Sequence, residues 1–196
     1  MDEKTATRQR ICEAAGKRFM HYGYAKTAMA EIARDLGMST GNLYRFYESK
    51  LDIAEEIASW HDAQEDEVLK EIVDRNEPAL ERLRRFLFTM LERTFETMAN
   101  PNKKAFEIAQ AISRERPAYP NKRMATERVF LRRILADGIA EGALRNADDL
   151  DYVAEMIQCA TMKYRYPQLY CFLTLPQLER ELAGVFDMLV EGLAAR

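Results

Sequence analysis

The sequence predicts an all-α protein of about nine helices. Apolar residues recur at steps of three and four along most of the 196 residues, and no stretch shows the sustained alternation of a β-strand. All six prolines lie beyond residue 77, at the starts of the apolar-periodic stretches or between them. Helices are expected at residues 5–22, 28–35, 39–46, 50–74, 77–99, 102–114, 121–141, 149–165 and 175–194.

The composition indicates a chain that is long enough to bury a core without disulfides or a structural metal. Cys12, Cys159 and Cys171 are odd in number and include no CxxC pair, so neither a disulfide framework nor a zinc site is expected. No charged start leads into an apolar signal segment, and the most apolar windows are too short to cross a bilayer. We therefore expect a cytoplasmic protein with no membrane contact and no cofactor.

Charge is distributed unevenly along the chain. The whole chain has a net charge of −3, but residues 1–50 contain nine Lys or Arg and six Asp or Glu, a net of +3. The rest of the chain contains 20 basic and 26 acidic residues, a net of −6. A locally basic N-terminal unit suits a DNA-binding domain, because binding to phosphates depends on local rather than overall charge.

Two helix starts near the C-terminus have recognisable caps. Asp148 is expected to cap the helix that follows it, because a carboxylate there accepts from the free N–H groups of the first turn. Thr174 and Gln177 have the spacing of a capping box, which predicts a helix that begins at residue 175.

Residues 27–47 predict two short helices joined by a tight turn. Thr27 is expected to cap the first helix, and Ser39 the second. The first helix has one apolar face, made of Met29, Ile32, Ala33 and Leu36. Gly37 supplies the turn, and the second helix buries Leu43 and Tyr47, four residues apart. This arrangement is a helix-turn-helix.

The second of these helices has side chains that packing does not require, and they gather toward its N-terminal end. They are Thr40, Gly41, Asn42, Tyr44 and Arg45. A recognition helix enters the DNA major groove by that end, where such groups meet base edges or phosphates. Lys50 is expected to contact a phosphate, and the amides of Thr27 and Ser39 to offer anion sites at helix starts. Tyr47 is a further candidate, whereas Phe46 has no group that can hydrogen-bond a phosphate.

At these residues the chain resembles the tetracycline-repressor (TetR/AcrR) family of one-component transcriptional regulators. The matching positions are Ile11, Ala14, Ala15, Phe19, Gly23, Thr27, Ile32, Ala33, Gly37, Ser39, Gly41, Leu43, Tyr44, Ser49, Lys50 and Leu51. The chain departs from the family at Phe46 and Tyr47, where the family commonly has Tyr or His followed by Phe. The resemblance implies a repressor without catalytic activity, whose binding to operator DNA is relieved by a small-molecule inducer.

Two domains are expected: a helix-turn-helix DNA-binding domain at residues 1–50, and a helical effector-binding and dimerisation domain at residues 51–196. A homodimer places two recognition helices one DNA turn apart, so the double-stranded operator should be pseudo-palindromic. The effector is expected to be largely apolar or aromatic, because residues 51–166 offer rings and methionines with few convergent charges. The candidate contacts are Trp60, His61, Phe86, Met90, Phe106, Met124 and Tyr164.

The last two helices have more apolar surface than docking on one core requires, which predicts the dimer interface. The predicted interface residues are Leu150, Val153, Ile157, Ala160, Tyr164, Leu178, Leu182, Val185, Phe186 and Leu189. A second apolar face on the first of these helices consists of Tyr152, Met156 and Cys159. Pairing both helices with their symmetry mates would form a four-helix bundle.

Two other functions fit parts of the pattern. A sequence-tolerant DNA-binding protein without an effector would show little preference for an operator and would lack a cavity. A metal-dependent helical enzyme could be built around His61 and neighbouring carboxylates such as Glu65, four residues away, although no third ligand is identified. The chain contains no Walker loop, no HExxH and no GxSxG motif, so we predict a regulator and not an enzyme.

Overall fold

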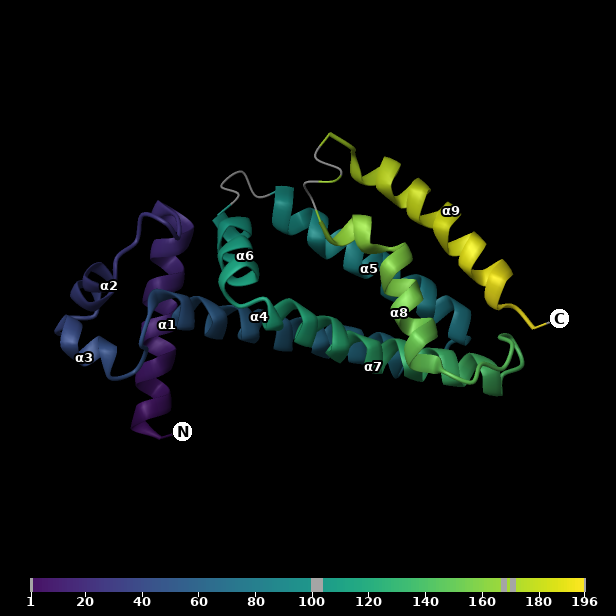
Figure 1. The fold of residues 1–196 in the computed structure, drawn as a ribbon, viewed down its shortest axis with the longest axis horizontal. Coiled ribbons are helices and arrows are strands. Elements are labelled where there is room, and N and C mark those ends of the chain that lie inside the picture. Colours follow the sequence, from purple (N-terminus) through teal and green to yellow (C-terminus); the bar gives the residue numbers. More distant parts are fainter. Residues whose placement is uncertain (1, 100–103, 167–168, 170–171, 196) are drawn as a thin grey trace. The chain divides into compact units, whose positions relative to one another are not determined.

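A computed structural model describes residues 2–99, 104–166, 169 and 172–195, and in these ranges the chain forms nine α-helices and no strand (Figure 1). The helices are α1 (Glu3–Tyr22), α2 (Met29–Asp35), α3 (Thr40–Tyr44), α4 (Lys50–Val73), α5 (Ala79–Ala99), α6 (Lys104–Glu115), α7 (Ala118–Ala140), α8 (Leu150–Ala160) and α9 (Leu175–Leu193), with a 3-10 turn, η1 (Met162–Arg165), after α8. The predicted fold class is confirmed. None of the described helices is both long and apolar enough to span a bilayer.

The helix boundaries differ most from the predictions at two places. Helix α7 begins at Ala118, three residues early, because Pro120 lies in its first turn, where the missing proline N–H is not needed. The helix expected at residues 149–165 ends at Ala160 and continues as the separate turn η1. The first two residues of the helix expected at 102–114 lie outside the described residues.

One of the two predicted C-terminal caps is shifted by a residue. The N-cap of α8 is Asp149 and not Asp148, and its carboxylate accepts a hydrogen bond from the Tyr152 N–H at 3.0 Å. The capping box of α9 is present, because the Gln177 side chain accepts from the Thr174 N–H at 2.9 Å.

The chain divides into two compact units. The first contains Met1–Gln64 and Asn100–Pro120, and the second contains Glu65–Ala99 and Asn121–Arg196. The first part of α4 and the whole of α6 therefore pack with α1–α3, although the sequence was divided at residue 50. The assignment of DNA binding to residues 1–50 and of effector binding to the rest stays a prediction.

The core of the first unit is small and draws on five helices. Helix α2 contacts both α1 and α3, and α6 contacts α1. The buried residues of this core include Ile11, Ala15 and Phe19 of α1, Ile32 of α2, Leu43 of α3, Ile53 of α4 and Ile112 of α6. Each short helix of the predicted helix-turn-helix is thus held by apolar side chains from its neighbours.

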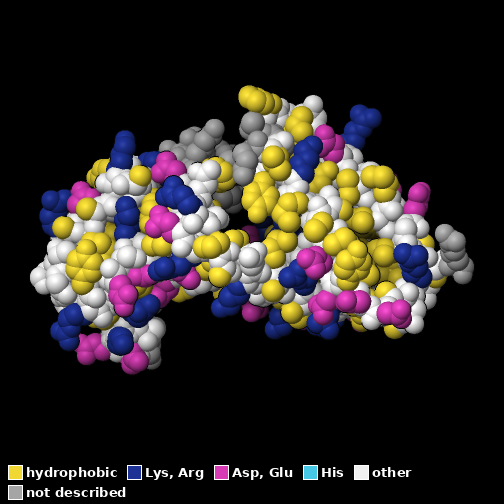
Figure 2. Space-filling view, in the orientation of Figure 1, with side chains coloured by type: hydrophobic (Ala, Val, Ile, Leu, Met, Phe, Trp, Pro, Cys, Tyr) yellow, Lys and Arg dark blue, Asp and Glu magenta, His cyan; other side chains and the backbone are white. Residues whose placement is uncertain are grey.

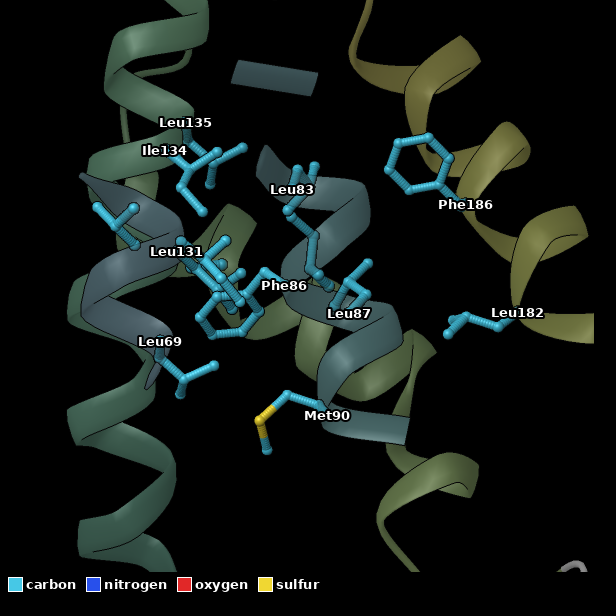
Figure 3. Packing of buried hydrophobic residues seen from close by; sticks show 14 of the residues in the cluster. Leu69, Leu83, Phe86, Leu87, Met90, Leu131, Ile134, Leu135, Leu182 and Phe186 are labelled. Carbon is cyan, nitrogen blue, oxygen red and sulfur yellow. The ribbon is translucent and has the colours of Figure 1, made fainter. Parts of the chain in front are cut away.

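The core of the second unit is organised around α5 (Figure 3). Figure 3 shows α5 side chains between those of α7 and those of α9, with Leu69 of α4 also in the cluster. The labelled residues are Leu83, Phe86, Leu87 and Met90 of α5, Leu131, Ile134 and Leu135 of α7, and Leu182 and Phe186 of α9. Burial of this apolar surface is the main stabilising contribution to the unit.

Candidate nucleic-acid interface

The predicted helix-turn-helix consists of α2, a turn and α3, which lie beside α1 (Figure 1). Gly37 in the turn has a φ of +66°, a left-handed conformation that glycine adopts without steric cost. The Ser39 hydroxyl accepts a hydrogen bond from the Asn42 N–H at 3.1 Å, as the N-cap prediction requires. Leu43 is the buried residue of α3. Because a five-residue helix is too short to be stable by itself, its position depends on this anchor.

The five candidate contact residues of α3 and its C-cap lie at the surface. Gly41, Asn42, Tyr44 and Arg45 are exposed, and Thr40 is half-buried. Tyr44 is 50% exposed to solvent. A Cβ built on Gly41 would meet no other atom within 4 Å, so nothing in this chain requires glycine there. An exposed hydroxyl, amide, phenol and guanidinium beside a residue without a side chain suit close approach to a DNA groove.

Thr27 does not play the predicted role. Its side chain is buried, and the hydroxyl donates to the carbonyl of Gly23 at 2.9 Å. Its N–H donates to the Tyr24 carbonyl, so neither group is available to a phosphate. The N-cap of α2 is Ala28, whose N–H donates to the Glu31 carboxylate at 2.9 Å. Thr27 therefore closes the turn between α1 and α2.

Tyr47 is also internal. Its hydroxyl lies within hydrogen-bonding distance of Cys12 Sγ, at 3.1 Å, and its ring lies beneath the Arg8 guanidinium. Burial raises the pKa of the Cys12 thiol to about 11 and raises the pKa of the Tyr47 phenol above its ordinary value. Both groups therefore stay protonated. We remove Tyr47 from the candidate DNA contacts, because packing on α1 uses its polar atom.

Lys50 is bound within the protein as well. Its ammonium donates to the carbonyls of Tyr24, at 2.6 Å, and Thr27, at 2.8 Å, and lies 4.3 Å from the centroid of the Tyr24 ring. Burial lowers the pKa of this ammonium. Lys50 therefore has a structural role, in which the start of α4 holds the turn between α1 and α2. These bonds use two of its three ammonium donors, and the phosphate contact stays a prediction.

We expect Lys50→Ala to lower the free energy of unfolding of the first unit by about 1.5–3 kcal/mol, the range for hydrogen bonds to a charged group. Trp60, the one tryptophan of the chain, lies in this unit, so urea unfolding followed by its fluorescence measures the loss. Lys26→Ala removes an exposed lysine near the same turn and is the control. We define the log-salt slope as the slope of log affinity for DNA against log salt concentration. If stability is unchanged and this slope falls by about 1, Lys50 is a phosphate contact and not a structural residue.

The seven candidate effector contacts are divided between the two units. Trp60, His61 and Phe106 belong to the first, where Trp60 and His61 are exposed. The other four belong to the second unit: Phe86, Met90 and Tyr164, which are buried in its core, and Met124, which is half-buried. The largest set of candidates within one unit therefore consists of these last four. Among the described residues, no three His, Cys, Asp or Glu side chains are grouped so that they could hold a metal.

Sequence reasoning missed a buried ionic cluster in the second unit. Glu127 of α7 is only 1% exposed and pairs with Arg123, at 3.4 Å, and with Arg165. Arg123 also pairs with Glu65 at 3.3 Å and with Asp66. The expectation of few convergent charges was therefore wrong. The spacing of Arg123 and Glu127 was the available signal, but the same spacing is typical of solvated pairs on helix surfaces.

Gln158 of α8 extends this cluster. Its side-chain amide donates to the Met124 carbonyl at 3.0 Å and lies 3.5 Å from the Glu127 carboxylate. Its Oε1 atom is buried and has no hydrogen-bond partner among the described residues. A buried acceptor without a partner costs free energy, and a ligand that donates a hydrogen bond to it would recover that cost.

Comparison with known proteins agrees with this geometry. Residues 11–57 match the family described as "Bacterial regulatory proteins, tetR family". The HTH-type transcriptional regulator YhgD of Bacillus subtilis is 24% identical over 190 residues, which cover 94% of this chain and 95% of that protein. The HTH-type transcriptional repressor KstR2 of Mycobacterium tuberculosis is 27% identical over 158 residues, which cover 79% and 77%.

A solved structure shows the same fold. FadR of Thermus thermophilus, a TetR-family transcriptional repressor in complex with lauroyl-CoA, superposes with a TM-score of 0.68 at 20% identity over 96% of each chain. The fold and the exposed face of α3 define a helix-turn-helix transcriptional regulator. These matches confirm the resemblance to the TetR/AcrR family found in the sequence.

Proposed function

We propose that this protein is a transcriptional repressor that binds a pseudo-palindromic operator as a homodimer and is released by a small-molecule effector. The observation that supports it most directly is the exposed polar face of α3, held by a buried Leu43 and capped by Ser39. Members of the family bind operator DNA and small molecules, and KstR2, a relative over most of the chain, is described as a repressor. The function requires no catalytic group.

Selection of DNA fragments by the purified protein tests this function. Bound fragments are sequenced and footprinted, and they should share a site with two half-sites about 10 base pairs apart, as two-fold symmetry requires. Tyr44→Ala and Arg45→Ala should weaken operator binding by about 1–3 kcal/mol each. Arg180→Ala removes the same charge from an exposed position of α9 and serves as the control. Equal affinity for selected and random fragments would favour the sequence-tolerant alternative.

The dimer is proposed to form through α8 and α9, but with a contact surface that differs from the predicted one. Ile157, Leu178, Leu182 and Phe186 are buried within the chain itself, as is Tyr164, so they are removed from the predicted contacts. The surplus apolar surface of α8 is formed by Tyr152, Met156, Cys159 and Ala160, and Met188 adds to it on α9. Figure 2 shows hydrophobic side chains gathered over α8 on the face in view. Exposed apolar patches of this kind are typical of subunit interfaces.

Met156→Arg is expected to convert the dimer into a monomer of 22.7 kDa, because it places an unpaired charge in an apolar contact. Ala160→Arg should act in the same way. Sedimentation at micromolar concentration measures both, and Glu67→Arg, at an exposed position of α4, is the control. Since both substituted residues are exposed in the monomer, the far-ultraviolet circular dichroism should be retained. An unmodified protein that sediments as a monomer would contradict the proposed interface.

The effector is proposed to be a largely apolar or aromatic molecule bound in the second unit. Phe86, Met90 and Tyr164 of the core and the half-buried Met124 are its candidate apolar contacts. The unpaired Oε1 atom of Gln158 offers an acceptor for a donor group of the effector. FadR, in complex with lauroyl-CoA, shows that this fold can hold a molecule with a long apolar part. A coupling of about 1–3 kcal/mol would change operator affinity roughly 5–150-fold. Candidate compounds are scored by release of labelled operator DNA.

A further inference from the structure

The C-terminal end of the recognition helix is held by an arginine of α1. Arg8 Nη1 donates to the Phe46 carbonyl, two residues after α3, at 3.0 Å. Its Nη2 group pairs with the Glu56 carboxylate of α4. The guanidinium carbon lies 4.3 Å from the centroid of the Tyr47 ring. One side chain therefore contacts the segment after α3 and α4 at the same time.

This contact supplies a second fixed point for α3. Leu43 is the buried residue of α3 and fixes the helix from within the core. Arg8 fixes the chain three residues further along, at the Phe46 carbonyl. The planar fork of a guanidinium binds two acceptors in a set geometry, which a lysine ammonium does not do. Base contacts tolerate errors of only about 0.5 Å and 10–20° in the placement of their side chains.

We propose that Arg8 is a positioning residue for sequence-specific DNA binding, and that with Glu56 it sets the angle at which α3 meets the DNA. The inference rests on the proposed DNA-binding function. We call Arg8, Glu56 and the Phe46 carbonyl the α3 clamp.

The charge of Glu56 makes the α3 clamp testable. A carboxylate in a DNA-binding unit repels phosphates, so its neutralisation alone would strengthen binding to any DNA. If Glu56 instead acts by holding Arg8, Glu56→Gln must weaken binding to the operator. The two effects have opposite signs. Glu48→Gln, which neutralises an exposed carboxylate between α3 and α4, reports the charge effect by itself.

The experiment measures the affinity of the full-length protein for its selected operator and for random DNA at several salt concentrations. The variants are Arg8→Ala, Glu56→Gln and the double variant, with Lys17→Ala, an exposed lysine of α1, as the charge-matched control for Arg8. We expect each single variant to weaken operator binding about tenfold, the value of one lost base contact. Binding to random DNA and its dependence on salt should change no more than in the charge-matched controls, Lys17→Ala for Arg8 and Glu48→Gln for Glu56. The double variant should be little worse than either single one, because both break the same contact.

Three results would overturn the inference. Equal weakening on both DNAs, with a log-salt slope that falls by about 1, would make Arg8 a phosphate contact. Unchanged or stronger operator binding by Glu56→Gln would remove Glu56 from the α3 clamp. If Arg8→Ala does not fold, Arg8→Lys keeps the charge without the fork, and full operator affinity in that variant would exclude the α3 clamp. An unmodified protein that binds no DNA would contradict the proposed function instead.

Discussion

Replacement of Glu127 by alanine should lower the free energy of unfolding by about 3–5 kcal/mol, because it removes one partner of a buried ion pair and leaves the other uncompensated. Arg165 loses its partner in this cluster, whereas Arg123 keeps Glu65 and Asp66. The Arg165 side chain is only 13% exposed, so water cannot fully replace the carboxylate. Urea unfolding followed by circular dichroism measures the loss.

Two variants separate the ionic contribution of Glu127 from other effects. Glu127→Gln keeps one acceptor of nearly the same shape and should lose less than the alanine variant, since its amide oxygen can still accept a hydrogen bond from one of the two arginines. Glu191→Ala removes an exposed carboxylate of α9 and should change stability by less than about 0.5 kcal/mol. A Glu127→Ala protein as stable as the Glu191→Ala protein would mean that the cluster is hydrated and contributes little.

Leu43→Ala should lower the free energy of unfolding of the first unit by about 2–5 kcal/mol and abolish operator binding. Leu43 is fully buried and is the anchor of α3, so its removal leaves a cavity beneath a helix that cannot be stable by itself. Trp60 fluorescence follows the unfolding of this unit.

A volume-conserving change is the control for Leu43. Leu43→Met should lose less than about 1.5 kcal/mol and keep most of the operator affinity. If Leu43→Ala bound the operator as tightly as Leu43→Met under conditions in which both are folded, α3 would be held mainly by other contacts. The Arg8 contact at Phe46 would then be the first of these to examine.

The helix-turn-helix was predictable because its signals are local. Gly37, Ser39 and Leu43 lie within seven residues, and each determines a feature of the backbone beside it: a left-handed turn, a helix start and a buried anchor. The roles of Thr27, Tyr47 and Lys50 were not predictable in this way. Their partners depend on how α1 lies against α2 and α4, which no spacing within residues 27–50 describes.

The same contrast applies to the apolar helices of the second unit. Periodicity along α8 shows that Ile157 lies on one face and Tyr152 and Met156 on another, because the angle between residues on a helix follows from its geometry. It does not show which face meets the core. The structure buries Ile157 and exposes Met156. The face of α8 that is available to a partner is therefore the one beside the predicted contact surface.

From the sequence alone, the all-α fold class, the approximate bounds of the helices, the recognition helix and the family were determined, because each depends on patterns within a few turns of one segment. The tertiary structure decided which polar groups remain available. Glu127 is enclosed by arginines from residues 123 and 165, and Lys50 is bound by carbonyls of the turn after α1. A charged group takes its role from the atoms that surround it in space, and those come from segments far apart in the chain.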